Sequence, residues 1–168
     1  MTPVDEGNDG TIDYYKVEAV ERLDEEQTIP GNVNGIPVKE VEKLYKNENN
    51  FDYGSVVKKV IIEEGVETLE DNALAYTSDL SEVQLPSTTK FLGKNLFSRN
   101  FYGDLKKLTI IYNGTMDDFK KLVANSDGDW YNGLKSGTTV VCTDGTFTLS
   151  STSYGVTVGN YKWSPSLN

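Results

Sequence analysis

The chain has 168 residues, of which 37% are apolar and 25% charged, and its 26 acidic residues outnumber its 16 basic ones, giving a net charge of −10. This length and composition fit one folded domain with a single core. Histidine is absent and Cys142 is the one cysteine. Their scarcity excludes Ser-His-Asp and Cys-His nucleophile systems, histidine metal ligands, Cys-rich zinc sites and an intrachain disulfide.

The first segment, residues 1–12, is acidic and polar, and we expect it to be flexible. It is unlike a secretory signal, and no run of 18 apolar residues follows that could span a membrane. Residues 1–50 carry 12 acids and 5 bases, which argues against direct binding to a nucleic-acid backbone. The compartment stays open, because a leader removed from the natural protein would leave the same sequence.

A repeat dominates the middle of the chain. After a predicted strand at 14–20 and an exposed polar loop at 46–54, the pattern apolar, two polar, apolar, any, apolar occurs at 57–62 and again at 80–85, a step of 23. It occurs a third time at 105–110, a step of 25. A second pattern repeats at the same step of 23 between the strands: Val66, Leu69, Asn72, Ala73 and Leu74 match Thr89, Leu92, Asn95, Leu96 and Phe97.

Such a repeat predicts a solenoid, because each unit has an apolar stripe that can be buried only against its neighbours. We expect two interior columns, one of Val60, Val83 and Leu108, and one of Ile62, Leu85 and Ile110. Cys142 lies in an alternating apolar run and is expected to be a small buried hydrophobe.

These units resemble the BspA-type (treponemal-type) leucine-rich repeat family. The resemblance rests on Thr28-Ile29-Pro30, on 33–38 followed by Val41, and on the two full units with Leu85-Pro86, and it covers about residues 14–146. The chain departs from the family pattern at Glu63-Glu64, which replaces a proline, and at Ala73-Leu74, which stands for Ala-Phe. The resemblance implies a mainly β fold with short helices (α+β), a short right-handed leucine-rich-repeat solenoid with N- and C-terminal caps. It also implies surface-associated or secreted bacterial adhesion proteins, or phages of such hosts.

The ends of the array are expected to cover its open edges. Thr115–Asp118 predicts a capping box that opens a short helix, with Phe119, Leu122 and Val123 on one face. Trp130 and Tyr131 should fold over the last repeat. We predict a hairpin at 139–149 that turns about Asp144-Gly145, and a second hairpin that turns about Gly159-Asn160. The repeat domain is therefore placed at 13–149, with 150–168 as a hairpin or tail packed on its cap.

The outward strand positions are the candidate binding site. One row is predicted to contain Lys59, Glu82 and Lys107, and the next Ile61, Gln84 and Thr109. The charges in the row of Lys59, Glu82 and Lys107 alternate. These side chains therefore either form ion pairs with one another or belong to a recognition face.

Other candidate sites have simpler structural explanations. Asp127-Gly128-Asp129 lacks the further carboxylates of a calcium loop, and the acids of 63–71 suit a solvated face better than glycoside hydrolysis. The aromatic residues Trp130, Tyr131, Tyr161 and Trp163 suit a lid better than a sugar platform. No metal or other cofactor is expected.

The sequence therefore favours a non-enzymatic protein-interaction module without membrane insertion. One alternative is an acidic intracellular inhibitor or decoy, of the phage anti-defence type, that blocks a basic nucleic-acid-binding target. The other is a carbohydrate-binding surface domain.

Overall fold

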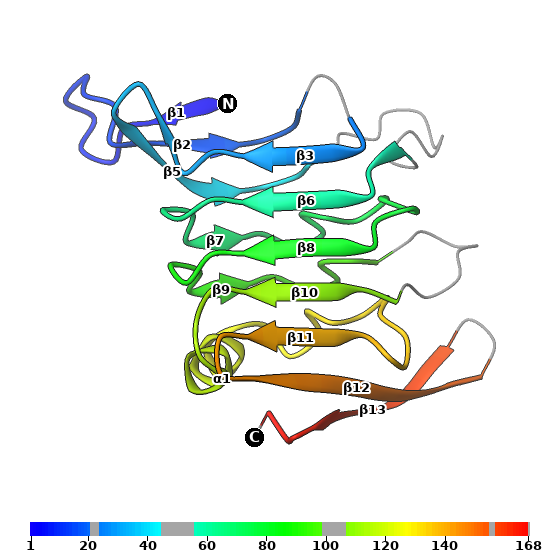
Figure 1. The fold of residues 1–168 in the computed structure, drawn as a ribbon. Coiled ribbons are helices and arrows are strands. Elements are labelled where there is room, and N and C mark those ends of the chain that lie inside the picture. Colours follow the sequence, from blue (N-terminus) through cyan, green and yellow to red (C-terminus); the bar gives the residue numbers. More distant parts are fainter. Residues whose placement is uncertain (21–23, 45–55, 99–106, 155–156, 168) are drawn as a thin grey trace.

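The protein is a β-solenoid of about four turns (Figure 1). The structure, a computed structural model, describes residues 1–20, 24–44, 56–98, 107–154 and 157–167. The exposed loop predicted at 46–54 lies outside these residues.

Two sheets form the walls of the solenoid. One contains β1 (Thr2–Val4), β2 (Tyr14–Val17), β4 (Asn32–Val33), β5 (Ile36–Val41), β7 (Thr68–Leu69) and β9 (Phe91–Leu92). The seven-stranded sheet contains β3 (Glu26–Ile29), β6 (Lys59–Ile62), β8 (Glu82–Leu85), β10 (Thr109–Tyr112), β11 (Thr139–Cys142), β12 (Gly145–Tyr154) and β13 (Thr157–Ser164). From β5 to β10 the chain alternates between the two sheets, and in each sheet the strands of successive turns are parallel.

The core lies between the sheets because the strands alternate buried and partly exposed residues. Four-residue strands such as β6, β8 and β10 bury their second and fourth side chains. Val60 and Val83 are paired in register, as are Leu69 and Leu92 on the return side. The step of 23 is thereby confirmed on both walls.

The alignment predicted for the third repeat is wrong by two residues. Glu82 lies beside Thr109, Val83 beside Ile110 and Leu85 beside Tyr112, a step of 27 instead of 25. The interior columns therefore end in Ile110 and Tyr112, while Leu108 lies one position before β10, where it is also buried. A shift of two residues keeps each side chain on its own face, so the alternation of Leu108, Ile110 and Tyr112 fits either register.

The N-terminal segment contains a strand inside the region predicted to be flexible. β1 pairs antiparallel with β2. The turn between them is held by carboxylates, since Asp5 Oδ2 accepts a hydrogen bond from Gly10 N at 2.8 Å and Asp13 Oδ2 accepts one from Glu6 N at 2.8 Å. These acidic side chains stabilise the turn by accepting backbone hydrogen bonds. The net charge of the segment, from which flexibility was predicted, does not indicate this role.

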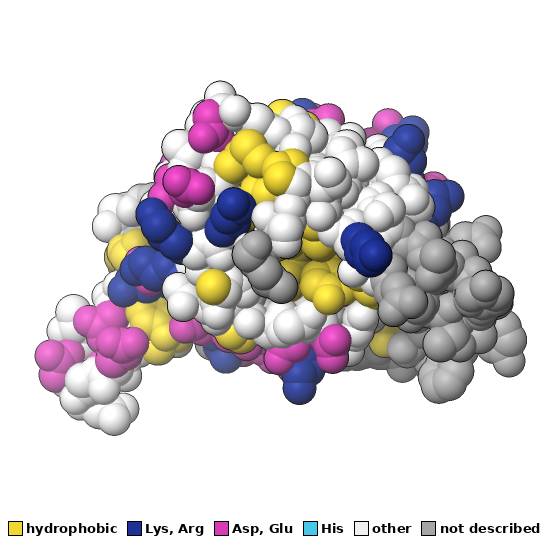
Figure 2. Space-filling view, turned by 90° about the horizontal axis from the view of Figure 1, so that it is seen from below, with side chains coloured by type: hydrophobic (Ala, Val, Ile, Leu, Met, Phe, Trp, Pro, Cys, Tyr) yellow, Lys and Arg dark blue, Asp and Glu magenta, His cyan; other side chains and the backbone are white. Residues whose placement is uncertain are grey.

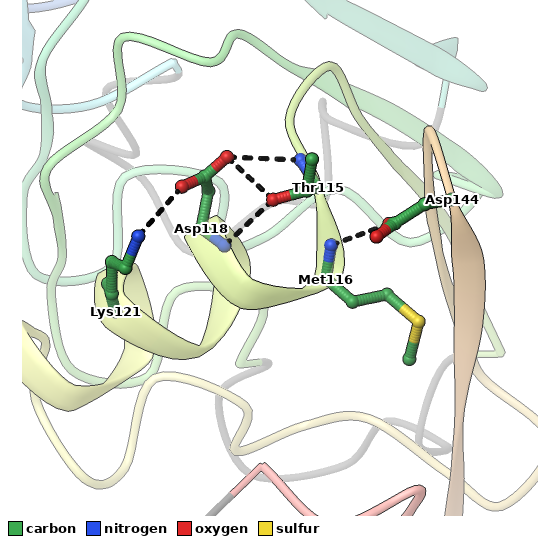
Figure 3. A network of polar contacts seen from close by, with 5 residues as sticks. All are labelled: Thr115, Met116, Asp118, Lys121 and Asp144. Atoms are coloured by element: carbon green, nitrogen blue, oxygen red, sulfur yellow. Dashed lines mark hydrogen bonds and ion pairs between the residues drawn. The ribbon is translucent and has the colours of Figure 1, made fainter.

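The one helix in the described part of the chain, α1 (Met116–Asn125), begins with the predicted capping box. Asp118 N donates to Thr115 Oγ1 at 3.1 Å, and Thr115 N donates to Asp118 Oδ2 at 3.4 Å (Figure 3). Asp144, from the β11–β12 turn, accepts a hydrogen bond from Met116 N at 2.7 Å. The first four amides of a helix have no partners within it, and here side chains from two segments accept hydrogen bonds from three of them, those of Thr115, Met116 and Asp118. Phe119 and Leu122 are buried and Val123 is partly buried, as predicted.

Both predicted C-terminal hairpins form, but each turns at another place. In the first, Cys142 pairs with Gly145, so Thr143 and Asp144 are the turn residues, and neither has the positive φ of a type I′ turn. In the second, Tyr154 pairs with Thr157 and the residues between them lie outside the described part of the chain. Gly159-Asn160 lies within β13, where the register shifts as in a β-bulge. β12 also runs through the boundary predicted after residue 149.

Candidate interaction surface

The outer face of the seven-stranded sheet presents two parallel rows of side chains. Neighbours within a row belong to adjacent strands and lie about 4.8 Å apart along the stack. The first row contains Glu26, Lys59, Glu82, Thr109, Thr139 and Thr148. The second row contains Thr28, Ile61, Gln84, Ile111, Val141 and Thr146.

The first row begins with a charged ladder. Lys59 Nζ lies 3.4 Å from Glu26 Oε2 and 3.2 Å from Glu82 Oε1. The hydrogen bond to Glu82, together with the charges of Glu26 and Glu82, raises the pKa of Lys59. All three side chains are at least a third exposed, so solvent screens these pairs and each contributes little to stability.

Lys107 is not part of the ladder. Because the third repeat is offset by two residues, Thr109 occupies the place beside Glu82. Lys107 is exposed and lies before β10, and its aliphatic stem lies beside Gly137, in the turn that leads to β11. The ladder is therefore Glu26–Lys59–Glu82, in which the predicted Lys59–Glu82 contact is present.

Half of the second row is aliphatic. Ile61 and Ile111 are partly exposed and Val141 is 36% exposed. The solvent-facing side of a sheet is ordinarily polar, so three β-branched aliphatic residues in one outward row are unusual. Beside them in the first row stand Thr109 and Thr139, which are uncharged.

Of the six predicted site residues, five lie on this face. Lys59, Glu82 and Thr109 share the first row, whereas Ile61 and Gln84 share the second. The sequence interpretation missed Ile111 and Val141. The alternation Thr109-Ile110-Ile111-Tyr112 could have identified Ile111 as outward-facing, because its neighbours Ile110 and Tyr112 point into the core.

The six-stranded sheet carries a second, acidic surface. A cleft of about 500 Å³ is lined by Glu40, Glu42, Glu70 and Asp71 together with two lysines, Lys16 and Lys43. Burial and the nearby charge of Glu40 raise the pKa of Glu70. Lys16 Nζ offsets part of this charge from 3.3 Å away from Glu42 Oε2.

The aromatic residues near the C-terminus pack together. Trp130 is fully buried and makes edge-to-face contacts with Phe97 and Phe119 at centroid distances of 6.4 and 5.9 Å. Trp163 stacks on it at 5.9 Å with an interplanar angle of 16°. Trp130 therefore packs against Phe97, Phe119 and Trp163 and has no free face for a sugar.

Other candidate chemistry takes structural roles. Burial raises the pKa of the Cys142 thiol to about 11, which suits an inert buried residue. Burial would also raise the pKa of Glu64, but hydrogen bonds from Ser87, Asn113 and Thr88 lower it overall, so this carboxylate joins successive turns.

Among the described residues, no group of three or more acidic or cysteine side chains is placed to hold a metal ion. The single described helix is too short to cross a membrane. Compared with protein-family models, curated proteins and solved structures, the chain matches none of them.

Proposed function

We propose that this chain is a non-enzymatic protein-interaction module that binds a partner protein through the outer face of its seven-stranded sheet. The observation that carries the proposal is the outward aliphatic row of Ile61, Ile111 and Val141. Exposed apolar groups gathered in one place on a folded protein mark interaction sites more often than scattered ones do.

The surroundings of this row resemble the anatomy of a protein interface. Such interfaces have an apolar centre depleted of charge and a polar rim. Here Thr109 and Thr139 border the aliphatic residues, and the Glu26–Lys59–Glu82 ladder lies at the far end of the same face. A partner is expected to place an apolar patch on β10 and β11 and polar groups over β3 and β6.

The scaffold proposed for this role is a BspA-type leucine-rich repeat whose terminal segments act as caps. The support is the repeat step of 23 and the Thr28-Ile29-Pro30 and Leu85-Pro86 patterns, which resemble that family. Stacked repeats of this kind offer extended surfaces suited to macromolecular partners.

The test replaces two aliphatic residues of the face with charges. The variant Ile111→Glu, Val141→Glu is compared with Ile12→Glu, Val56→Glu, a matched control that changes two exposed aliphatic residues outside the two rows. Partners captured by the wild-type chain are identified, purified and titrated by calorimetry. We expect the control to bind like the wild type and the face variant to bind at least tenfold more weakly, with a negative heat-capacity change for the wild-type complex. Equal binding by the face variant would contradict the proposal.

A second candidate function rests on the acidic cleft of the six-stranded sheet. Its four carboxylates suit a basic partner, as an inhibitor or decoy of a nucleic-acid-binding protein would require. Salt separates the two candidates, because binding by the acidic cleft should weaken steeply as ionic strength rises, whereas binding by the aliphatic row should not.

A further inference from the structure

Asparagine followed by glycine occurs three times in the chain, at Asn34-Gly35, Asn113-Gly114 and Asn132-Gly133. In this dipeptide the glycine amide nitrogen can attack the side-chain carbonyl carbon of the asparagine, because glycine has no Cβ to hinder the approach. The reaction needs an amide that is free to lose its proton and a carboxamide that is free to turn towards it. The three sites therefore differ in reactivity according to how firmly the fold holds these two groups.

Asn34-Gly35 is held at its nucleophile. The two residues form the tip of the β4–β5 hairpin, with φ of 54° and 88° as in a type I′ turn, between the paired residues Val33 and Ile36. Gly35 N donates a hydrogen bond to Asn32 Oδ1 at 2.8 Å. Although Asn34 is exposed, the nucleophile of this site is a hydrogen-bonded amide inside a closed turn.

Asn132-Gly133 is held at its carboxamide. Asn132 is partly buried, and its Nδ2 donates to Asn95 Oδ1 at 2.9 Å. Gly133 packs so closely that a Cβ there would lie 2.8 Å from Phe97 O. The carboxamide can turn towards the Gly133 amide only by giving up its hydrogen bond inside a packed segment.

Asn113-Gly114 lacks both restraints. Asn113 is exposed, and within the described part of the chain the Gly114 amide donates no hydrogen bond and the Asn113 carbonyl accepts none. The Asn113 carboxamide makes a long hydrogen bond, from Nδ2 to Glu64 Oε1 at 3.4 Å. The chain is anchored on either side, since Asn113 N donates to Leu85 O and Gly114 O accepts from Thr143 N, both at 3.0 Å. The peptide group between these two anchors, which contains the nucleophile, is not tied.

We infer that Asn113 is a site of self-catalysed deamidation. Gly114 N loses its proton to water and bonds to Asn113 Cγ, while the bond from Cγ to Nδ2 breaks. The departing nitrogen takes up a proton from water and leaves as ammonia, so that a succinimide ring remains. Water then opens the ring at either carbonyl and leaves aspartate or isoaspartate in place of Asn113. Water is the only reactant besides the chain, and the inference does not depend on the proposed function.

The products carry a carboxylate where the structure has an amide donor. The Glu64 carboxylate accepts hydrogen bonds from Ser87 and Asn113 and so joins successive turns. A carboxylate in place of the amide removes the second of these bonds and repels Glu64. Isoaspartate also lengthens the backbone by one atom between the two anchors. We therefore expect the modified chain to be loosened where β8, β10 and β11 meet.

Trypsin places each Asn-Gly site in its own peptide, residues 23–39, 108–120 and 122–135. The full chain is aged in mildly alkaline buffer, once folded and once in urea, and the three peptides are followed by mass spectrometry with fragmentation. The rates in urea are the reference, because the fold no longer distinguishes the sites. We expect the ratio of folded to unfolded rate to be about tenfold larger at Asn113 than at Asn34 or Asn132, which must first give up a hydrogen bond or a packed conformation. Equal ratios at the three sites, or no product at Asn113 in the folded chain, would overturn the inference.

Variants then test the site in the intact protein. The chain carries ten excess negative charges, and acidic and basic side chains lie interspersed on the face seen in Figure 2, so one further carboxylate is resolved by anion-exchange chromatography of the folded chain. We expect the wild type and Asn34→Gln to accumulate the more acidic form and Asn113→Gln not to, because glutamine would have to close a six-membered ring. Accumulation at the wild-type rate in Asn113→Gln would contradict the assignment.

A second pair of variants tests the effect of the product. Asn113→Asp should lower Tm by about 2–4 °C, whereas Asn34→Asp, which adds the same charge on an exposed hairpin, should leave it unchanged. Equal Tm values for the two variants would contradict the loosening at Glu64.

Discussion

Replacing Leu85 with alanine tests whether the stacked columns hold the solenoid together. Leu85 has no exposed surface, and the register places it beside Tyr112 on one side and Ile62 on the other. A buried Leu→Ala substitution loses transfer free energy and leaves a cavity, and it costs about 2–5 kcal/mol in well-packed cores. Because Leu85 packs against the turns of the solenoid on both sides, we expect Leu85→Ala to lower the free energy of unfolding by about 3 kcal/mol. This is a large share of the stability of an ordinary domain.

The measurement is urea unfolding followed by far-ultraviolet circular dichroism. Gln84→Ala is the matched control, since it changes the next residue on the same strand but on the outer face, and it should alter the free energy of unfolding by less than about 0.5 kcal/mol. For a chain of this size, a loss of about 3 kcal/mol corresponds to a fall of about 6–12 °C in Tm. Similar costs for Leu85→Ala and Gln84→Ala would refute the interior column.

Double-mutant cycles test the register itself. Leu85 and Tyr112 lie side by side, so truncating both should give a coupling free energy of about 0.5 kcal/mol or more. Leu85 and Leu108 are both buried, but Leu108 lies four residues before Tyr112 along the strand direction, and their effects should add. Additive effects for Leu85 and Tyr112 would show that the register is wrong.

The remaining predictions concern a glycine and a helix cap. A Cβ on Gly31 would meet the backbone carbonyl of Glu64, whereas a Cβ on Gly7 would have only ordinary contacts. We therefore expect Gly31→Ala to lower the free energy of unfolding by about 2–3 kcal/mol and Gly7→Ala to change it hardly at all. Equal Tm values for the two variants in thermal unfolding would contradict the close approach of the two backbone segments. Hydrogen bonds from Thr115 and then from Lys121 lower the pKa of Asp118 below 3.8. The contribution of this carboxylate to stability is therefore fully present above pH 3.8 and is lost as pH falls through the lower folded-state value. Thr115→Ala should therefore cost about 1 kcal/mol at pH 7 and less at pH 2.5 in urea unfolding, and a cost that does not change with pH would count against the capping box.

The sequence predicted the solenoid because two independent apolar patterns repeat at one step. In one sheet Val60 lies beside Val83, and in the other Leu69 lies beside Leu92. Because both sheets require the same step of 23, few other alignments of the repeat are possible. The third repeat had only one wall to align it. Inward and outward residues alternate from Leu108 to Tyr112. This alternation shows which side chains point into the core, but it fits two registers that differ by two residues.

Long-range contacts were beyond the reach of local patterns. The helix cap at Thr115 and Asp118 is local and was predicted, but the hydrogen bond from Met116 N to Asp144 joins residues 28 positions apart. Likewise, the four aromatic residues could be expected to cover the last turn, whereas the stacking of Trp163 on Trp130 follows from how β13 packs.

Charge is distributed unevenly over the outer face of the seven-stranded sheet. The ion pairs of the outer face belong to β3, β6 and β8, whereas the outward residues of β10 and β11 are threonine or aliphatic. The sequence follows the same division, since residues 1–50 carry seven excess negative charges and residues 101–168 carry none. Binding over the uncharged outward residues of β10 and β11 involves little desolvation of ionised groups, while the acidic first part of the chain repels other acidic surfaces. We therefore expect partner binding through β10 and β11 to depend weakly on salt.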